Sequence, residues 1–292
     1  MSPVLSHWSA SWPALIAYAA VAGAHLAGLL RLLRRHARLP AGRSAVIREA
    51  AVFHGGLLVA LLALVSPVGY WSAVYVWVRA IQDLALAIVA PGLIVLGAPW
   101  PALASCLGRP GATRESGGGD GPAWWLRWPV AAVVAFNVIW LAWHVPALFD
   151  RVPADPAAAA AEYALYLGAG MLFWLQVIGS RPWSPSGAPL RRAALLIGTV
   201  VADTVLGMVL VFGSGVLYPV YANAAHHVMT VVDDQQLAGA VLWMGMLPPA
   251  IVAAVAVLVR WLNEEESRAL SAGIDRLLTQ RDPAWPSRPR FR

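Results

Sequence analysis

Seven long apolar segments dominate this chain and constrain its fold more than any other feature. A bilayer core is about 30 Å thick, so a membrane-spanning helix needs about 20 mostly apolar residues. The segments that meet this requirement are Trp12–Leu33, Ala50–Ser66, Val74–Ala98, Trp128–Phe149, Ala157–Gly179, Leu190–Phe212 and Gln236–Leu262. Only 12% of the 292 residues are charged, about half the share in an ordinary soluble domain. The sequence therefore predicts an all-α integral membrane bundle of seven helices, and it argues against a soluble protein.

Two regions are expected along the chain: a membrane domain over residues 1–262 and a C-terminal tail over residues 263–292. The first apolar segment lacks the basic leader and the small-residue cleavage site of a signal peptide, so we expect it to be retained as a helix. Residues 108–123 include three consecutive glycines and predict a flexible connection. In the tail, Glu264–Thr279 is expected to form a short amphipathic helix at the membrane surface.

Arginine is distributed unevenly between the connections of this topology. All 21 basic residues are arginine, and 19 of them lie on one side. On the opposite side only Arg151 remains, and Arg79 falls within the third segment. Because basic residues concentrate in cytoplasmic loops, the N-terminus is predicted outside and the C-terminus in the cytoplasm, in a multi-pass protein of the cell membrane. The same distribution explains the net charge of +6 without a nucleic acid partner.

Charged side chains within the apolar segments indicate where chemistry would occur, because they are costly at membrane depth. Arg79 and Asp83 are four residues apart, so they share one face of a helix. Two interpretations remain open: an internal ion pair that fixes helix packing, or a polar contact to a substrate, a partner or a proton path. Asp203 has no partner nearby in sequence. We expect it to face the bundle, either paired with Arg79 or protonated.

Histidine and methionine are the potential copper ligands of this chain, since the single cysteine, Cys106, excludes a thiolate cluster. His144 lies near the outer end of the fourth segment. His226, His227 and Met229 follow in an outer connection, and together these four residues would supply a Cu(I) site. The alternative is that they are solvated loop residues. His25 and His54 belong to the opposite half of the membrane and are expected to be hydrogen-bonded within the core.

Further polar residues open the fifth and seventh segments, on the same outer side as His144. Asp234 is also a good N-cap residue for the helix that it begins. The candidate polar pocket therefore consists of Arg79, Asp83, His144, Glu162, Asp203, Asp234, Gln235 and Gln236.

Short motifs at the ends of the apolar segments occur in a distinctive order. They include Ala63–Pro67, Leu96–Pro99, Trp143–Asp150, Leu217–Ala222 and Asp234–Gly239. In this order they resemble the CtaG family of polytopic cytochrome c oxidase assembly proteins, over about residues 50–262. The resemblance implies a seven-helical fold and a role in maturing haem–copper oxidases, around copper insertion.

Three histidines expected from this resemblance are absent. Family members usually carry His-x-x-x-His early in the third span, where this chain has Arg79 and Asp83, and Glu-His early in the fifth, where it has Glu162 and Tyr163. An arginine cannot coordinate a cation. The chain therefore resembles a divergent member that cannot hold a metal in the same way.

Three functions remain open after this comparison. The first is an assembly factor that inserts copper into, or stabilises, a subunit of a haem–copper terminal oxidase. The second is a metal-free accessory or scaffold subunit of a respiratory complex, and the third is a small membrane carrier. We expect no enzyme, because the sequence offers no nucleophile paired with a base.

Overall fold

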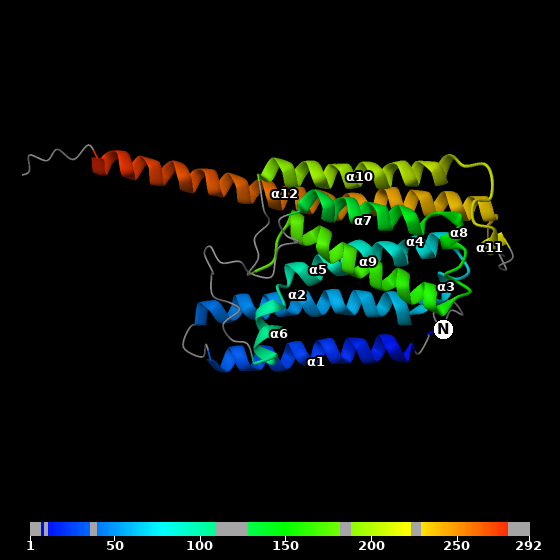
Figure 1. Cartoon of the computed structure of the whole chain (residues 1–292), viewed down its shortest axis with the longest axis horizontal. Coiled ribbons are helices and arrows are strands. Elements are labelled where there is room, and N and C mark those ends of the chain that lie inside the picture. Colours follow the sequence, from blue (N-terminus) through cyan, green and yellow to red (C-terminus); the bar gives the residue numbers. More distant parts are fainter. Residues whose placement is uncertain are drawn as a thin grey trace, which may run out of the picture.

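The computed structural model describes residues 7–8, 11–35, 40–108, 128–181, 188–222 and 229–279, and this part of the chain is helical without a β-strand. The helices that form the body of the bundle run along a common direction (Figure 1) and are α1 (Trp12–Arg35), α2 (Pro40–Val65), α4 (Val76–Leu84), α5 (Ala90–Leu96), α7 (Pro129–Trp143), α9 (Pro156–Val177), α10 (Pro189–Phe212) and α12 (Val231–Thr279). A π-helix, η2 (Ala85–Val89), joins α4 to α5. Short helices cover the ends of the bundle: α3 (Pro67–Trp71), α6 (Trp100–Cys106), α8 (Pro146–Phe149) and α11 (Pro219–Ala222).

Six helices of the described part are long and apolar enough to cross a membrane. The predicted span Trp128–Phe149 is interrupted, because the chain forms α7 with 15 residues and then the separate α8. Pro146 explains the interruption: a residue before proline is driven out of the α-helical conformation, and Val145 has an extended backbone with ψ 130°. A helix of 15 residues measures about 22 Å, which leaves a seventh crossing as a prediction.

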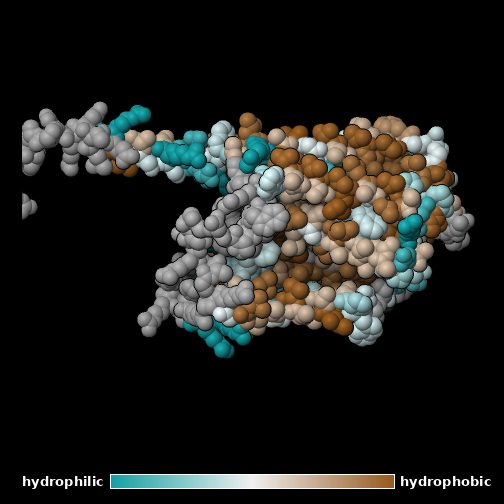
Figure 2. Space-filling view, viewed as in Figure 1, coloured by the Kyte–Doolittle hydropathy of each residue, from teal (hydrophilic) through white to brown (hydrophobic). Residues whose placement is uncertain are grey.

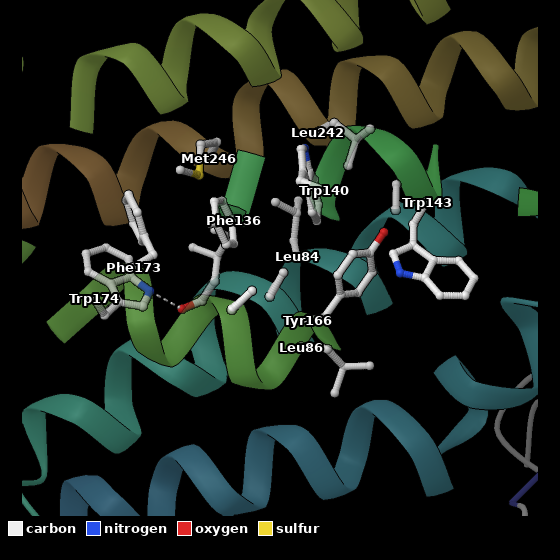
Figure 3. Close-up of a cluster of buried hydrophobic side chains, with 14 of the residues drawn as sticks. Leu84, Leu86, Phe136, Trp140, Trp143, Tyr166, Phe173, Trp174, Leu242 and Met246 are labelled. Carbon is white, nitrogen blue, oxygen red and sulfur yellow. Dashed lines mark hydrogen bonds between the residues drawn. The ribbon is translucent and has the colours of Figure 1, made fainter. Parts of the chain in front are cut away.

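The third span, α4–η2–α5, lies at the centre of the bundle. Of its apolar stretch 78% is buried, compared with 17–39% in the other five candidate spans. Its π-helical turn has a local cause, since Pro91 lacks an N–H and its ring crowds the carbonyl four residues earlier. Trp174 on α9 donates its indole N–H to the carbonyl of Ile88 within this turn, at 2.8 Å (Figure 3). The centre of the bundle is therefore fixed to α9.

Aromatic and aliphatic side chains from α4, η2, α7, α9 and α12 form one buried cluster. Leu86 and Phe173 are fully buried there, and Phe136 stacks on Phe173 with ring centroids 4.9 Å apart (Figure 3). By contrast, large apolar side chains on α7 and α10 are exposed, such as Val134 at 53% and Val205 at 56%. Figure 2 shows the same apolar covering on the visible side of the bundle, as expected for a surface in contact with lipid.

The C-terminal tail differs from its prediction in one respect. Glu264–Thr279 is helical, but it is the uninterrupted end of α12, which has 49 residues and projects beyond the bundle (Figure 1). The prediction of a separate helix at the membrane surface is therefore wrong. No glycine or proline occurs between Pro249 and Gly273 to end the helix. Ion pairs from Arg268 to Glu264, at 3.5 Å, and to Glu265, at 3.2 Å, support it further. The predicted domain boundary at residue 262 falls inside this helix.

Candidate functional site

Arg79 lies at the centre of a buried charged cluster near the end of the bundle where α4 begins. Its Nη2 donates to Glu162 Oε1 on α9 at 2.5 Å, and its Nε lies 3.5 Å from Asp83 Oδ1, one turn along α4. Arg79 is 2% exposed and both carboxylates are fully buried. The guanidinium also lies over the Phe149 ring, 4.5 Å from its centroid. The ion pair predicted from the spacing forms, and Glu162 adds a second carboxylate that the spacing does not indicate.

His144 completes this central cluster from the end of α7. Its Nδ1 donates to the carbonyl oxygen of Trp140 at 2.8 Å, and since a carbonyl only accepts, Nδ1 carries the hydrogen. The other ring nitrogen, Nε2, lies 3.9 Å from Asp83 Oδ2. The backbone bond therefore orients the ring so that Nε2 faces the carboxylate.

The cluster contains more acceptors than the described residues satisfy. Both oxygens of Asp83 and Oε2 of Glu162 are buried without a hydrogen bond in the described part of the chain. Buried polar atoms are normally hydrogen-bonded. Two carboxylates also face a single guanidinium, so one more positive charge or hydrogen-bond donor would be needed to balance them.

Asp234 has a different role from the one predicted. Instead of capping its own helix, it accepts the backbone N–H groups of Val76, at 2.9 Å, and Trp77, at 3.0 Å, at the start of α4. The N-cap residue of α4, Tyr75, makes no side-chain capping bond, so the cap comes from α12 across the bundle. A carboxylate at a helix N-terminus is favoured by the helix dipole. Asp234 thus positions the helix that carries Arg79.

The two glutamines that follow organise the connection between α10 and α12. Gln235 accepts the N–H of Leu217 at 2.8 Å and donates to the carbonyl of Gly215 at 3.2 Å. Gln236 donates to the carbonyl of Gly213 at 3.4 Å. They lie outside the Arg79 cluster, so the structure does not unite all eight predicted pocket residues.

Two tyrosines that the sequence analysis did not propose as site residues bind this connection to neighbouring segments, and one of them reaches the cluster. Tyr218 donates its hydroxyl to the carbonyl of His144 at 3.0 Å, and Tyr221 donates to the carbonyl of Ser72 at 2.9 Å. Burial raises the pKa of both hydroxyls, so both remain neutral donors. Their three-residue spacing in Leu217–Ala222 is the only sequence signal that points to them.

Asp203 faces the bundle as predicted, at 2% exposure, but it is not paired with Arg79. Its Oδ1 accepts from Trp140 Nε1 at 3.2 Å, in the contact between α7 and α10. One turn away, Asn137 donates to Thr199 Oγ1 at 2.9 Å. The expected pairing is wrong because Asp83 and Glu162 already neutralise Arg79. Trp140 links the two sites, since its own carbonyl binds His144.

The central cluster does not fit a copper ion. Arg79 lies between Asp83 and Glu162, where a metal would sit, and only His144 Nε2 and the carboxylate oxygens remain as donors. In the described part of the chain, no group of three or more histidine, cysteine or acidic side chains is arranged to hold a metal. His226 and His227 lie outside the described residues, and Met229 is partly buried just before α12.

His25 and His54 form a separate pair between α1 and α2. Nδ1 of His25 and Nε2 of His54 are 3.2 Å apart, and the His25 ring packs on Phe53. The prediction of a hydrogen-bonded core histidine is confirmed for His25, which is 2% exposed, whereas His54 is hydrogen-bonded but only partly buried.

Comparison with known proteins identifies the family to which this chain is similar. Residues 23–264 match the family model described as cytochrome c oxidase caa3 assembly factor (Caa3_CtaG). An uncharacterized protein of Mycobacterium leprae is 25% identical over 262 residues, which cover 84% of this chain but 38% of that protein. The chain thus spans less than two fifths of the length of this relative. No solved structure matches.

Proposed function

Because this chain belongs to the cytochrome c oxidase caa3 assembly factor family, we propose that it is a membrane scaffold that holds a subunit of a haem–copper oxidase during maturation. In this proposal α7 and α8 together complete a seventh crossing, the arginine-rich end faces the cytoplasm and the Arg79 cluster faces outward. The partner is a hydrophobic oxidase subunit within the same bilayer.

The observation that carries the proposal is the double pairing of Arg79 with Asp83 and Glu162. This guanidinium supplies both carboxylates with a counter-charge from the protein itself, at the position that a metal would take. Breaking a buried ion pair by removing one partner typically costs about 3–5 kcal/mol. An arrangement that separates Arg79 on α4 from Glu162 on α9 is therefore disfavoured, so the pair specifies how these two helices pack, as a scaffold requires.

The exposed apolar faces supply the surface for such a partner. Val134 on α7 and Val205 on α10 are more than half exposed, and the neighbouring exposed side chains on these helices are also apolar. In a bilayer these faces meet either lipid or another membrane helix. The scaffold proposal places an oxidase helix on part of them.

Copper insertion is the second candidate, and it rests on His144. A histidine that donates one ring N–H to a backbone carbonyl presents the other nitrogen in the orientation used for metal binding. In this candidate His226, His227 and Met229 would supply the other ligands, and Nε2 of His144 would turn from Asp83, which it faces at 3.9 Å, toward the copper ion.

Gene deletion and copper quantification test the two candidates together. We expect deletion to abolish assembled oxidase, measured from haem absorbance in membranes, and added copper not to restore it. Purified protein supplied with equimolar copper should retain far less than one ion per chain, and His144→Ala should not change that content. Equimolar copper that is lost in His144→Ala would establish copper insertion instead. Normal oxidase levels after deletion would contradict both candidates.

A further inference from the structure

A second unusual charge lies at the opposite, arginine-rich end of the bundle, where α10 begins. Arg192 is 7% exposed, although it stands at the end of a membrane-spanning helix where arginine side chains usually extend into water. Its Nε is buried and has no hydrogen bond partner in the described part of the chain. A guanidinium has five N–H donors and no acceptor, so the buried Nε–H of Arg192 requires an acceptor that the described residues do not provide.

A second arginine lies within electrostatic range of Arg192. Arg260 on α12 donates Nη1 to the carbonyl of Ile178, at the end of α9, at 2.7 Å. The charges of both Arg260 and Glu264 act on Arg192. Glu264 is itself paired with Arg268 at 3.5 Å. The charged neighbours of Arg192 are therefore one guanidinium and one carboxylate that is itself paired with Arg268, so positive charge is in excess around Arg192.

We propose that Arg192 and Arg260 form a binding site for an anionic phosphate group, supplied by an acidic phospholipid of the adjacent leaflet. The planar guanidinium fork matches the oxygens of a phosphate group, and such bonds are charge-assisted. The site lies where the spans end, at the depth of lipid head groups, and basic sites between membrane helices bind such head groups. A bound phosphate would also join α10 to α12 where α12 leaves the bundle (Figure 1). This inference is independent of the proposed function.

Lipid titration of the purified full-length protein, followed by native mass spectrometry, tests the site. The probes are phosphatidylglycerol, phosphatidylcholine and inorganic phosphate. We expect phosphatidylglycerol to bind more tightly than phosphatidylcholine. Arg192→Gln and Arg260→Gln should each weaken phosphatidylglycerol binding by about tenfold or more, as expected for the loss of one charge-assisted hydrogen bond. Phosphatidylcholine binding should not change.

The matched control is Arg181→Gln, which removes the same charge at the same end of the bundle. Arg181 is 68% exposed and pairs with Glu49, so its loss should leave phosphatidylglycerol binding unchanged. An equal loss in Arg181→Gln would mean non-specific attraction and overturn the proposal. So would unchanged binding in both site variants. Binding of inorganic phosphate without phosphatidylglycerol would support the anion site but assign it to a soluble phosphate. Because Arg260 is exposed, its variant tests the site even if Arg192→Gln fails to fold.

Discussion

Arg79 contacts the buried carboxylates of both Asp83 and Glu162. Replacing it with alanine leaves Asp83 and Glu162 buried without a counter-charge, so we expect a loss of about 3–5 kcal/mol in the free energy of unfolding. Denaturant unfolding in detergent micelles measures this value. The combined variant Arg79→Met, Asp83→Leu, Glu162→Met should recover much of the loss, because a buried charge network replaced by apolar side chains is often neutral in stability. No recovery would show that the charges themselves hold the helices.

Substitutions of Asp234 test whether the cap on α4 stabilises the site. Asp234→Ala leaves the N–H groups of Val76 and Trp77 without their acceptor, and loss of a cap costs about 1–2 kcal/mol. Asp234→Asn should lose less, since an amide oxygen still accepts. Glu266→Ala, on the exposed part of α12, is the control of similar charge change and should leave stability within about 0.5 kcal/mol of the parent. Equal effects of all three variants would contradict a capping role.

At the scale of single residues, the sequence predicts the local pair of Arg79, and it assigns Glu162 and His144 to the same pocket without indicating which side chains meet. The spacing of Arg79 and Asp83 is sufficient to predict their pair, because four residues span one helical turn. Glu162 is 83 residues from Arg79, and nothing local indicates that α9 passes beside α4. For the same reason, Asp234 looks like the cap of its own helix and Asp203 looks like a partner for Arg79.

At the scale of helices, a close approach between α9 and the π-helical turn holds the centre together. A Cβ atom at Gly170 would overlap the carbonyl oxygen of Ala87 and come within 2.8 Å of Pro91 Cγ. We therefore expect Gly170→Ala to lower the free energy of unfolding by about 1–3 kcal/mol, the usual cost of overpacking. Thermal melting in detergent measures the change.

Gly168 provides the control on the same helix. A Cβ atom there meets nothing within 4 Å, so Gly168→Ala should be neutral or stabilising by up to about 1 kcal/mol, the helix preference of alanine over glycine. Similar losses in both variants would show that the contact of Gly170 with Ala87 does not determine the result.

Proline explains where the helix boundaries differ from the apolar pattern. The pattern runs without a break through Trp128–Phe149, yet Pro146 separates α7 from α8. In α12, by contrast, Pro248 and Pro249 lie inside a helix that continues to Thr279. Sequence alone does not separate these cases, because the outcome depends on whether neighbouring helices support the turn that proline weakens.

At the scale of the whole molecule, the all-helical membrane bundle was predictable because it follows from composition and the length of the apolar segments. The burial of the third span was not predictable from these two properties. Its mean hydropathy of 1.7 lies within the range of 1.3–2.3 that the other candidate spans cover. What distinguishes it is the presence of Arg79, Gln82 and Asp83, which are tolerated only where other helices surround them.

The orientation of the molecule is the last prediction, and α12 makes it measurable. With 49 residues, α12 is about 74 Å long, while the bilayer core takes about 30 Å, so its charged C-terminal part extends well into one aqueous compartment. The positive-inside rule assigns that compartment to the cytoplasm. In a Cys106→Ser background, a cysteine at Ser271 should react with a membrane-impermeant thiol reagent only after cells are permeabilised. A cysteine at Val145, which is 50% exposed at the opposite end, should react in intact cells. The reverse pattern would place the Arg79 cluster on the cytoplasmic side and contradict the outward-facing arrangement in the proposed function.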